Sequence, residues 1–448
     1  MNQLQLFLPC AAGVEALLAT EVQRVTGIAG KAWRAGVQLQ GSWRDALQLN
    51  LHSRLAQRVL IELQHGLYRN EQDLYNAAAS VAWEIWFTPK QTFKVEITAQ
   101  HSPLTSLNFA ALKIKDAIAD RFRAKYDVRP DVDTHWPDVR VYAHLTTDSV
   151  TVYIDTSGEP LFKRGWREDK GDAPLKETLA AAMIAASGWD ELCKQGVPLY
   201  DPCCGSGTIA IEAAQIACNI APGINRRFAF QKYLPFQGHV WDGLLDQAEA
   251  AITEPTAPVF GSDVSFRMVD FAERNAERAG VAKAVQFRGG DALQRMPPAP
   301  SGVMLVNPPY GERIDVAGVA GISAVQSRNQ RDERRQGVDE FGQPLRRDAV
   351  ASDTPRDRSA NPGREQAQTD SGEEAADFFP QLAAHWKKNY AGWTAHVLTP
   401  DLKLPSKMRL KESRRVPMWN GPIECRLFRF DMVAGSARGK PAGAPQTP

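Results

Sequence analysis

The alternation of apolar and polar positions predicts two small units of mixed helices and strands in the first 157 residues. "LQLFLPC" alternates as a strand does, and "GVEALLATEVQRVTG" has the apolar spacing of a helix that ends at Gly27. "GVQLQG" predicts a short strand, and "WRDALQLNLHSRLAQRVLIEL" begins as another helix. We therefore expect residues 1–65 to form one small α+β unit.

The second unit, residues 66–157, begins with a helix over "NEQDLYNAAASVAWEIWF" and continues with the strand "TFKVEITA". In "NFAALKIKDAIADRFRAKY", an apolar stripe at helical spacing is formed by Ile114, Ala117, Ile118 and Phe122. "VRVYAHLTTDSVTVYID" alternates on both sides of a polar turn, which predicts a hairpin. This unit is therefore also expected to be α+β.

The pattern changes at Lys176. After the Ala-rich helix "KETLAAAMIAASGW", the short apolar strands "VPLYD", "PVFGSD", "AVQFRGGD" and "GVMLVN" each end in Asp or Asn, with helical segments between them. This alternation predicts a parallel, doubly wound α/β sheet. Ligands bind at the carboxyl ends of such strands, where these polar side chains stand.

Residues 323–376 interrupt this pattern, because they have almost no large apolar side chains and no periodicity. Such a segment cannot offset the entropy of ordering by burial, so we expect a disordered surface insertion. A nucleic-acid contact through its arginines is the alternative, but the composition of the segment favours a solvated loop. A helix and two strands follow, and the Gly/Pro/Ala-rich tail, residues 434–448, is expected to be frayed.

The composition limits the class of protein and of partner but does not indicate a function. The chain has 448 residues, of which 43% are hydrophobic and 23% charged, which predicts a soluble globular protein of two to four domains. The formal charge of +1 favours no class of partner, so a polyanion would have to be bound by local basic stretches. We expect no secretory signal and no membrane span. Six scattered cysteines without a CxxC pair favour a reducing cytoplasm and no metal site.

The stretch "LYDPCCGSGTIAIEAA" places a glycine-rich turn between a strand and a helix. Gly205 and Gly207 would let the backbone approach a cofactor closely, next to the free N–H groups at the helix start. No Lys follows Thr208, which disfavours a nucleotide triphosphate. Asp201, just before the glycines, suits an ammonium group better than a pyrophosphate.

Two further acids end strands in the same region. Asp263 stands where a carboxylate would hold a ribose diol, and Asp291 could accept from an adenine amine. The gap of about 60 residues between the glycines and Asp263 is longer than the roughly 20 of dinucleotide folds. Each acid could also be a helix N-cap.

Asn307-Pro308-Pro309-Tyr310 ends the fourth strand. The prolines stiffen the turn and leave carbonyl oxygens outward, Asn307 adds an amide acceptor, and Tyr310 offers a stacking face. Such a turn can hold an exocyclic amine, a weak nucleophile that requires positioning rather than a strong base. The alternative is a purely structural capped turn.

A nucleophilic cysteine is the competing mechanism, but residues 302–314 contain none. We expect Cys203 and Cys204 to be small packing residues of the cofactor turn. His385 and His396 have no partner in the pattern and are expected to be structural.

These motifs resemble a known family. "DPCCGSGT" and "NPPY" resemble motifs I and IV of class I S-adenosylmethionine-dependent methyltransferases. "NPPYGERI", with "PLKETLAAAMIAASGW" and "WNGPIECRLFRF", resembles the bacterial 23S rRNA guanine-N2 methyltransferases. "SLNFAALKIKDAIADRF" is similar to a THUMP helix, and "DTSGEPLFKRGWRED" to the segment that leads into catalysis.

The resemblance covers about residues 1–322 and 377–433. It implies a ferredoxin-like domain (1–65), a THUMP RNA-binding domain (66–157) and a Rossmann-like class I methyltransferase domain (158–433). The long excursion before the second strand also belongs to the family. Some members carry a second methyltransferase domain behind the first; this sequence departs from them by ending after one, so only guanine-N2 methylation is expected.

The resemblance also implies roles for single residues. The amine-holding residues are Asn307, Pro308, Pro309 and Tyr310. The cofactor-binding residues are Pro174, Lys176, Glu177, Asp201, Gly205, Gly207, Thr208, Asp263 and Asp291.

RNA contacts are expected from local basic patches, because each phosphate contact adds a salt-dependent attraction. The candidates are Lys113, Lys115, Arg121, Lys125, Lys163, Arg164, Arg167 and Arg313. The target base must leave its stack to reach the pocket. A tRNA guanine-N2 methyltransferase with a THUMP domain, and a catalytically inactive RNA-binding relative, remain alternatives. DNA adenine and release-factor glutamine methylation also use N-P-P-Y, but the RNA-type domains disfavour both.

Overall fold

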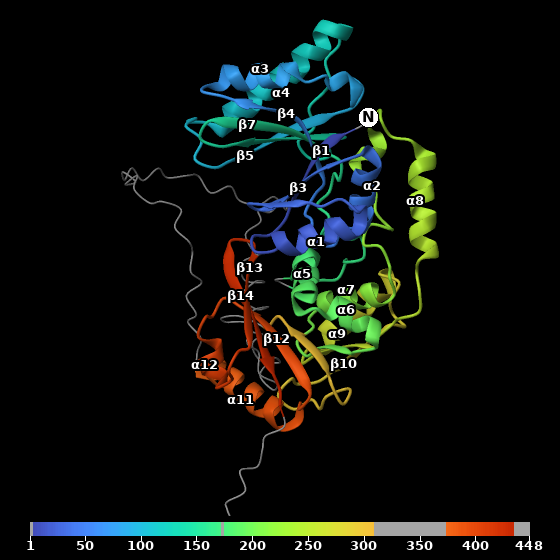
Figure 1. Ribbon diagram of the computed structural model, residues 1–448, viewed down its shortest axis with the longest axis vertical. Helices are drawn as coiled ribbons and strands as arrows, with labels where there is room; N and C mark the ends of the chain where they lie inside the picture. Colours follow the sequence, from blue (N-terminus) through green and yellow to red (C-terminus); the bar gives the residue numbers. More distant parts are fainter. Residues whose placement is uncertain (1–2, 172–173, 309–372, 434–448) are drawn as a thin grey trace, which may run out of the picture.

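The computed structural model of the chain describes residues 3–171, 174–308 and 373–433 and contains two seven-stranded sheets, one after the other along the sequence (Figure 1). The first sheet and its helices occupy one end of the molecule and the second sheet the other. None of the helices in these ranges combines the length and the apolar character needed to cross a bilayer.

The first sheet has the strand order β2-β3-β1-β4-β7-β6-β5. Its strands are β1 (Leu4–Pro9), β2 (Lys31–Trp33), β3 (Gly36–Gly41), β4 (Leu60–Leu67), β5 (Phe93–Ala99), β6 (Val139–Leu145) and β7 (Ser149–Asp155). Its helices are α1 (Glu15–Thr26), α2 (Trp43–His52), α3 (Glu71–Ser80) and α4 (Leu107–Tyr126).

Strand β4 joins the two predicted N-terminal units into this one sheet. It pairs antiparallel with β1 at Leu6↔Ile61, and with β7 along its whole length. The helix predicted to begin at Trp43 is confirmed and is short: a capping box between Ser42 and Asp45 starts α2, which ends at His52, and the chain is extended again from Leu60. The core is continuous across the two units, because β4 places Ile61 in it.

The observed helix in the range 70–87 is shorter than the sequence predicts. Asn70 caps α3, which ends at Ser80, and a 3-10 turn (Trp83–Ile85) follows. The break allows Trp83 and Phe87 to turn inward, where the Phe87 ring contacts Phe122 at 4.8 Å between centroids. Burial of these aromatic side chains therefore ends the helix earlier than the spacing of its apolar residues predicts.

Two helical predictions are confirmed. Helix α1 ends at Gly27, whose φ of 74° is left-handed. On α4, the predicted apolar stripe is buried, as shown by Ile114, Ala117, Ile118 and Phe122.

The second sheet has the order β10-β9-β8-β11-β12-β14-β13. Its strands are β8 (Leu199–Asp201), β9 (Val259–Asp263), β10 (Val285–Gly289), β11 (Gly302–Val306), β12 (Trp393–Thr399), β13 (Arg414–Asn420) and β14 (Ile423–Asp431). Its helices are α5 (Glu177–Ser187), α6 (Trp189–Leu192), α7 (Thr208–Ala217), α8 (Gly238–Ala250), α9 (Phe266–Arg278), α11 (Glu373–Asn389) and α12 (Leu404–Met408). The strands from β10 to β12 run parallel, and β14 reverses direction.

Both faces of this sheet are covered, as a doubly wound fold requires. In β11, Val303 and Leu305 join the core shared with α5 and α7, while Met304 and Val306 join the core under α11. Every residue of β11 is buried, which explains its uninterrupted apolar run. The predicted doubly wound fold is confirmed.

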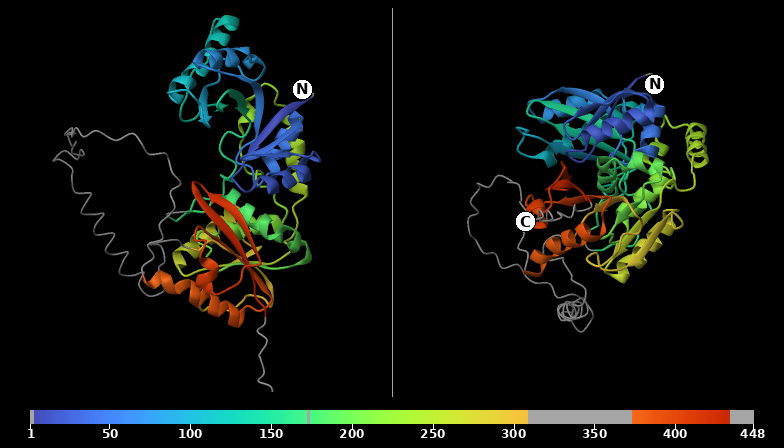
Figure 2. Two further views of the ribbon diagram at one scale, coloured as in Figure 1. Left: turned by 60° about the vertical axis from the view of Figure 1, so that its left-hand side comes forward. Right: turned by 60° about the horizontal axis from the view of Figure 1, so that its bottom comes forward.

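The excursion between α7 and β9 carries α8 along one flank of the molecule (Figures 1 and 2). It docks on the N-terminal half: the Gly223 N–H donates to the Leu51 carbonyl at 2.9 Å, and the Leu234 N–H donates to the Trp86 carbonyl at 2.9 Å. A Cβ on Gly223 would lie 2.8 Å from the Asn50 carbonyl oxygen, so the contact requires glycine. The residues that make the gap before Asp263 so long therefore connect the methyltransferase-like half of the chain to the N-terminal half.

The predicted disordered insertion is too long at its C-terminal end, because α11 begins at Glu373, inside the range 323–376. The rest of that insertion, and the predicted frayed tail 434–448, lie outside the described residues.

Candidate active site

The carboxyl ends of four parallel strands bring the predicted site residues to one edge of the second sheet. Asp201 at the end of β8 is level with Gly261 in β9, so Asp263 stands two residues beyond it. Gly289 in β10 is level with Asp263, which places Asp291 beyond both. On the other side, the β11–β8 register extends to Leu305 beside Asp201, so Asn307 also projects past the edge.

The glycine-rich turn has the backbone that its sequence predicts. Gly205 has φ +52° and Gly207 has φ +88°, both left-handed. A Cβ on Gly207 would lie 2.9 Å from Ala272 Cβ, whereas a Cβ on Gly205 would meet nothing within 4 Å. Gly207 is therefore required by packing, and Gly205 borders open space.

Three carboxylates surround this turn. The Gly205 N–H donates to Asp263 at 2.9 Å, and the Cys203 N–H donates to Asp201 at 3.1 Å. Burial raises the pKa of the Cys203 thiol well above its usual value, and the charges of Asp201, Asp263 and Asp291 raise it further. A thiolate is disfavoured there, in agreement with the prediction that this cysteine is not a nucleophile.

Asp201 itself is 1% exposed. Burial raises the pKa of its carboxyl to about 8, and the neighbouring Asp263 contributes further to this increase. Such a group ionises when a cation lies against it. Its position suits an ammonium group, as the sequence predicts.

Arg167 links the glycine turn to the start of α5. Its Nη2 donates to both the Leu175 carbonyl and Thr208 Oγ1 at 2.7 Å, and its Nε lies 3.0 Å from Glu177 Oε1. The stretch that contains the predicted cofactor residues Pro174, Lys176 and Glu177 is thereby held beside the turn. Arg167 was predicted to bind RNA; its contacts are instead directed at protein atoms.

Lys176 and Pro174 are exposed, and the Lys176 ammonium lies 5.2 Å from the centroid of the Phe162 ring. Glu177 is 3% exposed, and burial raises the pKa of its carboxyl despite the nearby Arg167. The Glu177 side chain is therefore buried in the protein beside Arg167.

Two residues of this edge were missed by the sequence reasoning. Phe266, three residues after Asp263, is 79% exposed, and a Cβ on Gly289 would lie 2.4 Å from its ring. Asn275 of α9 donates to the Ser206 carbonyl at 3.1 Å and steadies the turn from behind. An aromatic residue just after a strand-ending acid is a signal that could have indicated Phe266.

The turn that is predicted to hold the amine, residues 307–310, is described only in part. Asn307 follows β11 and is half-buried, and Pro308 is buried. The predicted residues Pro309, Tyr310 and Arg313 lie outside the described residues.

The two structural histidines are confirmed as such. The His385 ring contacts the Arg295 carbonyl at 2.7 Å and the Asn389 amide at 2.9 Å. His396 is 3% exposed, and burial lowers the pKa of its ring to about 4.

Most of the predicted RNA-binding cations are engaged within the protein. Arg121 and Lys125 both pair with Glu84, at 2.7 and 2.8 Å, and Lys115 pairs with Asp116 at 2.7 Å. Lys163 pairs with Glu159, and Lys113 lies 5.4 Å from the centroid of the Phe109 ring. Lys113 and the paired lysines keep partly exposed ammonium groups, so their RNA contacts stay predictions.

The position of Arg164 does not agree with the prediction that it binds RNA. It is 3% exposed, and its Nε donates to Glu212 at 3.0 Å. Glu212 of α7 also pairs with Arg54 from the first sheet's unit, at 3.2 Å. This buried triad joins the N-terminal half to the helix behind the glycine turn, and Arg164 cannot reach RNA from there.

S-adenosylmethionine fits this set of groups. Its ammonium would lie against Asp201, its ribose diol against Asp263, and its adenine beside Asp291 and the exposed ring of Phe266. Gly205, whose N–H donates to Asp263, borders open space, because a Cβ there would meet nothing within 4 Å. The hydrogen-bonding groups of the cofactor thus match the carboxylates and the aromatic ring that the chain places here.

Family models match three consecutive parts of the chain. Residues 5–60 match the RlmL ferredoxin-like domain, 68–155 the THUMP domain, and 164–321 the "RMKL-like, methyltransferase domain".

Curated relatives align along nearly the whole chain. "Ribosomal RNA large subunit methyltransferase K/L" of Psychromonas ingrahamii is 33% identical over 95% of this chain and 50% of its own length. The protein of the same name from Shewanella sediminis is 34% identical over 97% of this chain and 54% of its own length. The chain thus spans about half the length of the curated relatives it matches.

Solved structures share the fold along its length. A predicted N6-adenine-specific DNA methylase from Listeria monocytogenes superposes with a TM-score of 0.74 at 26% identity, covering 96% of both chains. A putative methyltransferase crystallised with S-adenosylhomocysteine gives a TM-score of 0.75 at 24% identity, covering 96% of this chain and 98% of its own. The family models thus match, in this order along the chain, an RlmL ferredoxin-like domain, a THUMP domain and an RMKL-like methyltransferase domain, and the solved structures share the fold of the whole.

Proposed function

We propose that this protein transfers a methyl group from S-adenosylmethionine to the exocyclic N2 amine of a guanine in large-subunit (23S) rRNA. The observation that carries the proposal is the alignment of 95–97% of the chain with relatives named as large-subunit rRNA methyltransferases. The row of polar groups at one sheet edge supports it, because that row can hold a cofactor and an amine side by side.

The cofactor supplies an electrophilic methyl group when it is bound. The chain's own part is to orient it: Asp201 takes the ammonium, Asp263 the ribose and Asp291 the adenine. Arg167 keeps Thr208 and Glu177 at fixed positions around this space.

The amine end of the site requires acceptors more than a base. A guanine amine has a delocalised lone pair, so hydrogen bonds that favour its pyramidal form lower the barrier. The Asn307 amide oxygen and the Pro308 carbonyl would accept from its two hydrogens, with Pro309 stiffening the turn and Tyr310 stacking on the base. The proton is lost to solvent after the N–C bond forms, since the methylated amine is then far more acidic.

The substrate and compartment follow from the same resemblance. The THUMP domain would bind RNA, and the target base would be flipped out of its helix. All six cysteines are free thiols, and five of them are buried, in keeping with our proposal of a reducing cytoplasm.

The test is mass spectrometry of ribosomal and transfer RNA from cells that lack the protein. Loss of one N2-methylguanosine from 23S rRNA, restored by purified protein and S-adenosylmethionine, is the expected result. Loss from tRNA alone would favour the THUMP-containing tRNA enzymes, and loss of N6-methyladenosine would make the amine an adenine's. Unchanged RNA together with no cofactor binding by calorimetry would indicate an inactive RNA-binding relative.

A further inference from the structure

Residues 403–415, here called the basic segment, run from the start of α12 to the start of β13. They contain six basic side chains and one acidic one, a difference of five charges, in a chain whose formal net charge is +1. The sequence reasoning did not single out this stretch.

Five of these cations are exposed and form no ion pair with any acid of the described residues. They are Lys403, Arg409, Lys411, Arg414 and Arg415. Lys407 alone is paired, with Asp401 at 2.8 Å.

The cations on α4 differ from those of the basic segment both in their ion pairing and in their position in the molecule. Four of the five cations of α4 form an ion pair with Glu84, Asp116 or Asp120, and two of these four share Glu84. Helix α4 also lies at the end of the molecule farthest from the second sheet (Figure 1). Of these two clusters of cations, the one that lacks ion pairs lies on the methyltransferase domain.

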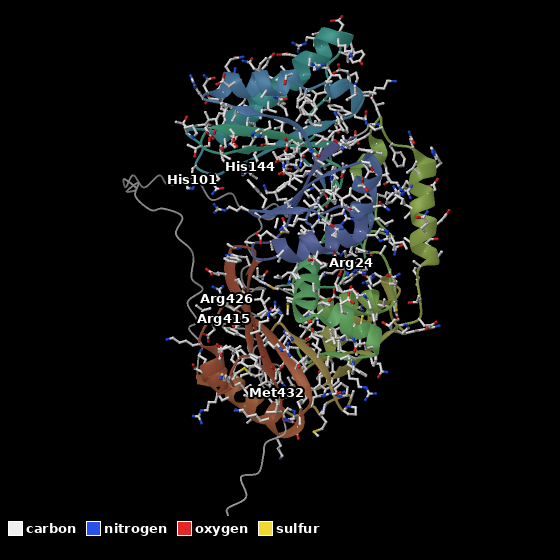
Figure 3. All side chains as sticks on the ribbon, viewed as in Figure 1. Arg24, His101, His144, Arg415, Arg426 and Met432 are labelled. Atoms are coloured by element: carbon white, nitrogen blue, oxygen red, sulfur yellow. The ribbon has the colours of Figure 1, made fainter. Side chains whose placement is uncertain are left out.

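The basic segment starts at the edge that carries the catalytic turn. Strands β11 and β12 are parallel neighbours, and their ladder ends with Val306 level with Val397, two residues before Pro308 and Thr399 respectively. The segment begins four residues after Thr399 and returns along the outside of the sheet to Arg414, which is level with Arg429 in β14. Figure 3 shows Arg415 next to Arg426 on the side of the molecule where α12 lies.

The stability of the fold does not explain this charge. Arg414 faces Arg429 across two strands; Asp431 pairs with Arg429 at 2.9 Å but forms no ion pair with Arg414, so the second positive charge at this position does not stabilise the fold. Charges on the edge strand β13 can prevent edge-to-edge pairing, which would account for Arg414 and Arg415. It would not account for Lys403, Arg409 and Lys411, which precede the strand.

We propose that the basic segment binds the phosphates of the RNA strand on one side of the target nucleotide. This rests on the proposed function, since it assigns the segment to the same substrate. A flipped base leaves its flanking phosphates outside the site that receives it, and unpaired Lys and Arg on the segment that follows β12 would neutralise them without reading sequence.

The experiment compares two triple variants of the full chain. Lys403→Gln/Arg409→Gln/Lys411→Gln removes three charges of the segment, and Lys90→Gln/Arg227→Gln/Lys283→Gln removes three exposed charges elsewhere. Binding of a short fluorescein-labelled RNA of mixed sequence is followed by anisotropy as salt is raised. The segment variant should bind at least about tenfold more weakly and lose about two units of the salt slope, whereas the control keeps both.

Methyl transfer to 23S rRNA from cells lacking the protein gives a second readout. The segment variant should show a KM for RNA raised about tenfold or more at unchanged cofactor affinity. Arg414→Gln/Arg415→Gln should weaken RNA binding in the same direction.

Equal RNA affinity of the segment variant and the control overturns the proposal, even if the β13 variant aggregates. So does loss of binding to phosphatidylglycerol vesicles with RNA affinity intact, because the ligand would then be a lipid surface. If the wild type binds RNA through the segment but methylates none, the inference stands and the proposed function fails. If the wild type binds no RNA, both fail.

Discussion

Asp201 combines a buried position with a carboxyl group that must become charged to hold a cation. In the ligand-free protein its pKa is about 8, so it is largely neutral at pH 7. Cofactor binding therefore has to release the proton, and this makes the site sensitive to pH.

We predict that affinity for S-adenosylmethionine rises roughly tenfold per unit between about pH 6 and about pH 7.5, because only the ionised carboxyl pairs with the ammonium. Calorimetry at several pH values measures it, and proton release appears as a dependence on buffer ionisation heat. Asp201→Asn should bind weakly at every pH. An affinity in the wild type that does not change with pH would contradict the assignment.

The same carboxyl affects stability with the opposite sign. Its folded pKa lies above the unfolded value of about 4, so its contribution is full below pH 4 and is lost as pH rises toward 8. Asp201→Asn should remove this part of the pH dependence in urea unfolding of the ligand-free protein.

Asn307 is the residue on which the chemistry depends most directly. We predict that Asn307→Ala lowers kcat by at least about a hundredfold, because one of the amine's acceptors is lost in the transition state. The Kd for S-adenosylmethionine should change less than about threefold by calorimetry, since the cofactor groups lie on other strands. Equal losses of both would show that Asn307 is a structural turn residue.

At the scale of elements, the start of α7 depends on one glycine. Gly207→Ala should lower the free energy of unfolding by about 2 kcal/mol or more, from the left-handed φ and from the Cβ forced to 2.9 Å from Ala272. Urea denaturation measures the loss. Gly188→Ala is the matched control: its φ is +76° but its Cβ would meet nothing within 4 Å, so about 1 kcal/mol is expected. Equal losses would show that packing against α9 does not matter.

The triad of Arg54, Glu212 and Arg164 fixes α7 to the N-terminal half. Glu212→Gln leaves two guanidinium groups without a carboxylate in a buried place and should cost about 3 kcal/mol in thermal or urea unfolding. Removing an exposed pair, by Glu191→Gln, should change the stability by less than about 1 kcal/mol. A similar small effect for both would mean that water reaches the triad.

Elements were predictable where one local pattern determined them. The stripe on α4 and the strand ends at Asp201, Asp263 and Asn307 follow from periodicity and from the rule for parallel sheets. Strand β4 was missed because "VLIEL" continues a helical run, and only pairing with β1 and β7 settles its conformation. The ion pairs of Arg164 with Glu212 and of Arg167 with Glu177 were not predicted, because charge in a sequence does not reveal its buried partner.

For the whole molecule, the shared first sheet predicts one folding unit in place of two. A chain of residues 1–157 should unfold in a single calorimetric transition, because β4 pairs on both sides and the core is continuous. A chain of residues 1–59 should show no cooperative transition. Two separable transitions in the longer chain would show that the units are independent.

Strand β4 also limits how such a protein can be rearranged by recombination. The ferredoxin-like match ends at residue 60, and the THUMP match begins at residue 68. Strand β4 runs from Leu60 to Leu67 and so spans the interval; its first two residues pair with β1, and seven of its eight residues pair with β7. A crossover placed between the two domains would therefore leave each parent half with an unpaired edge, so the two halves can be inherited or exchanged intact only as a pair.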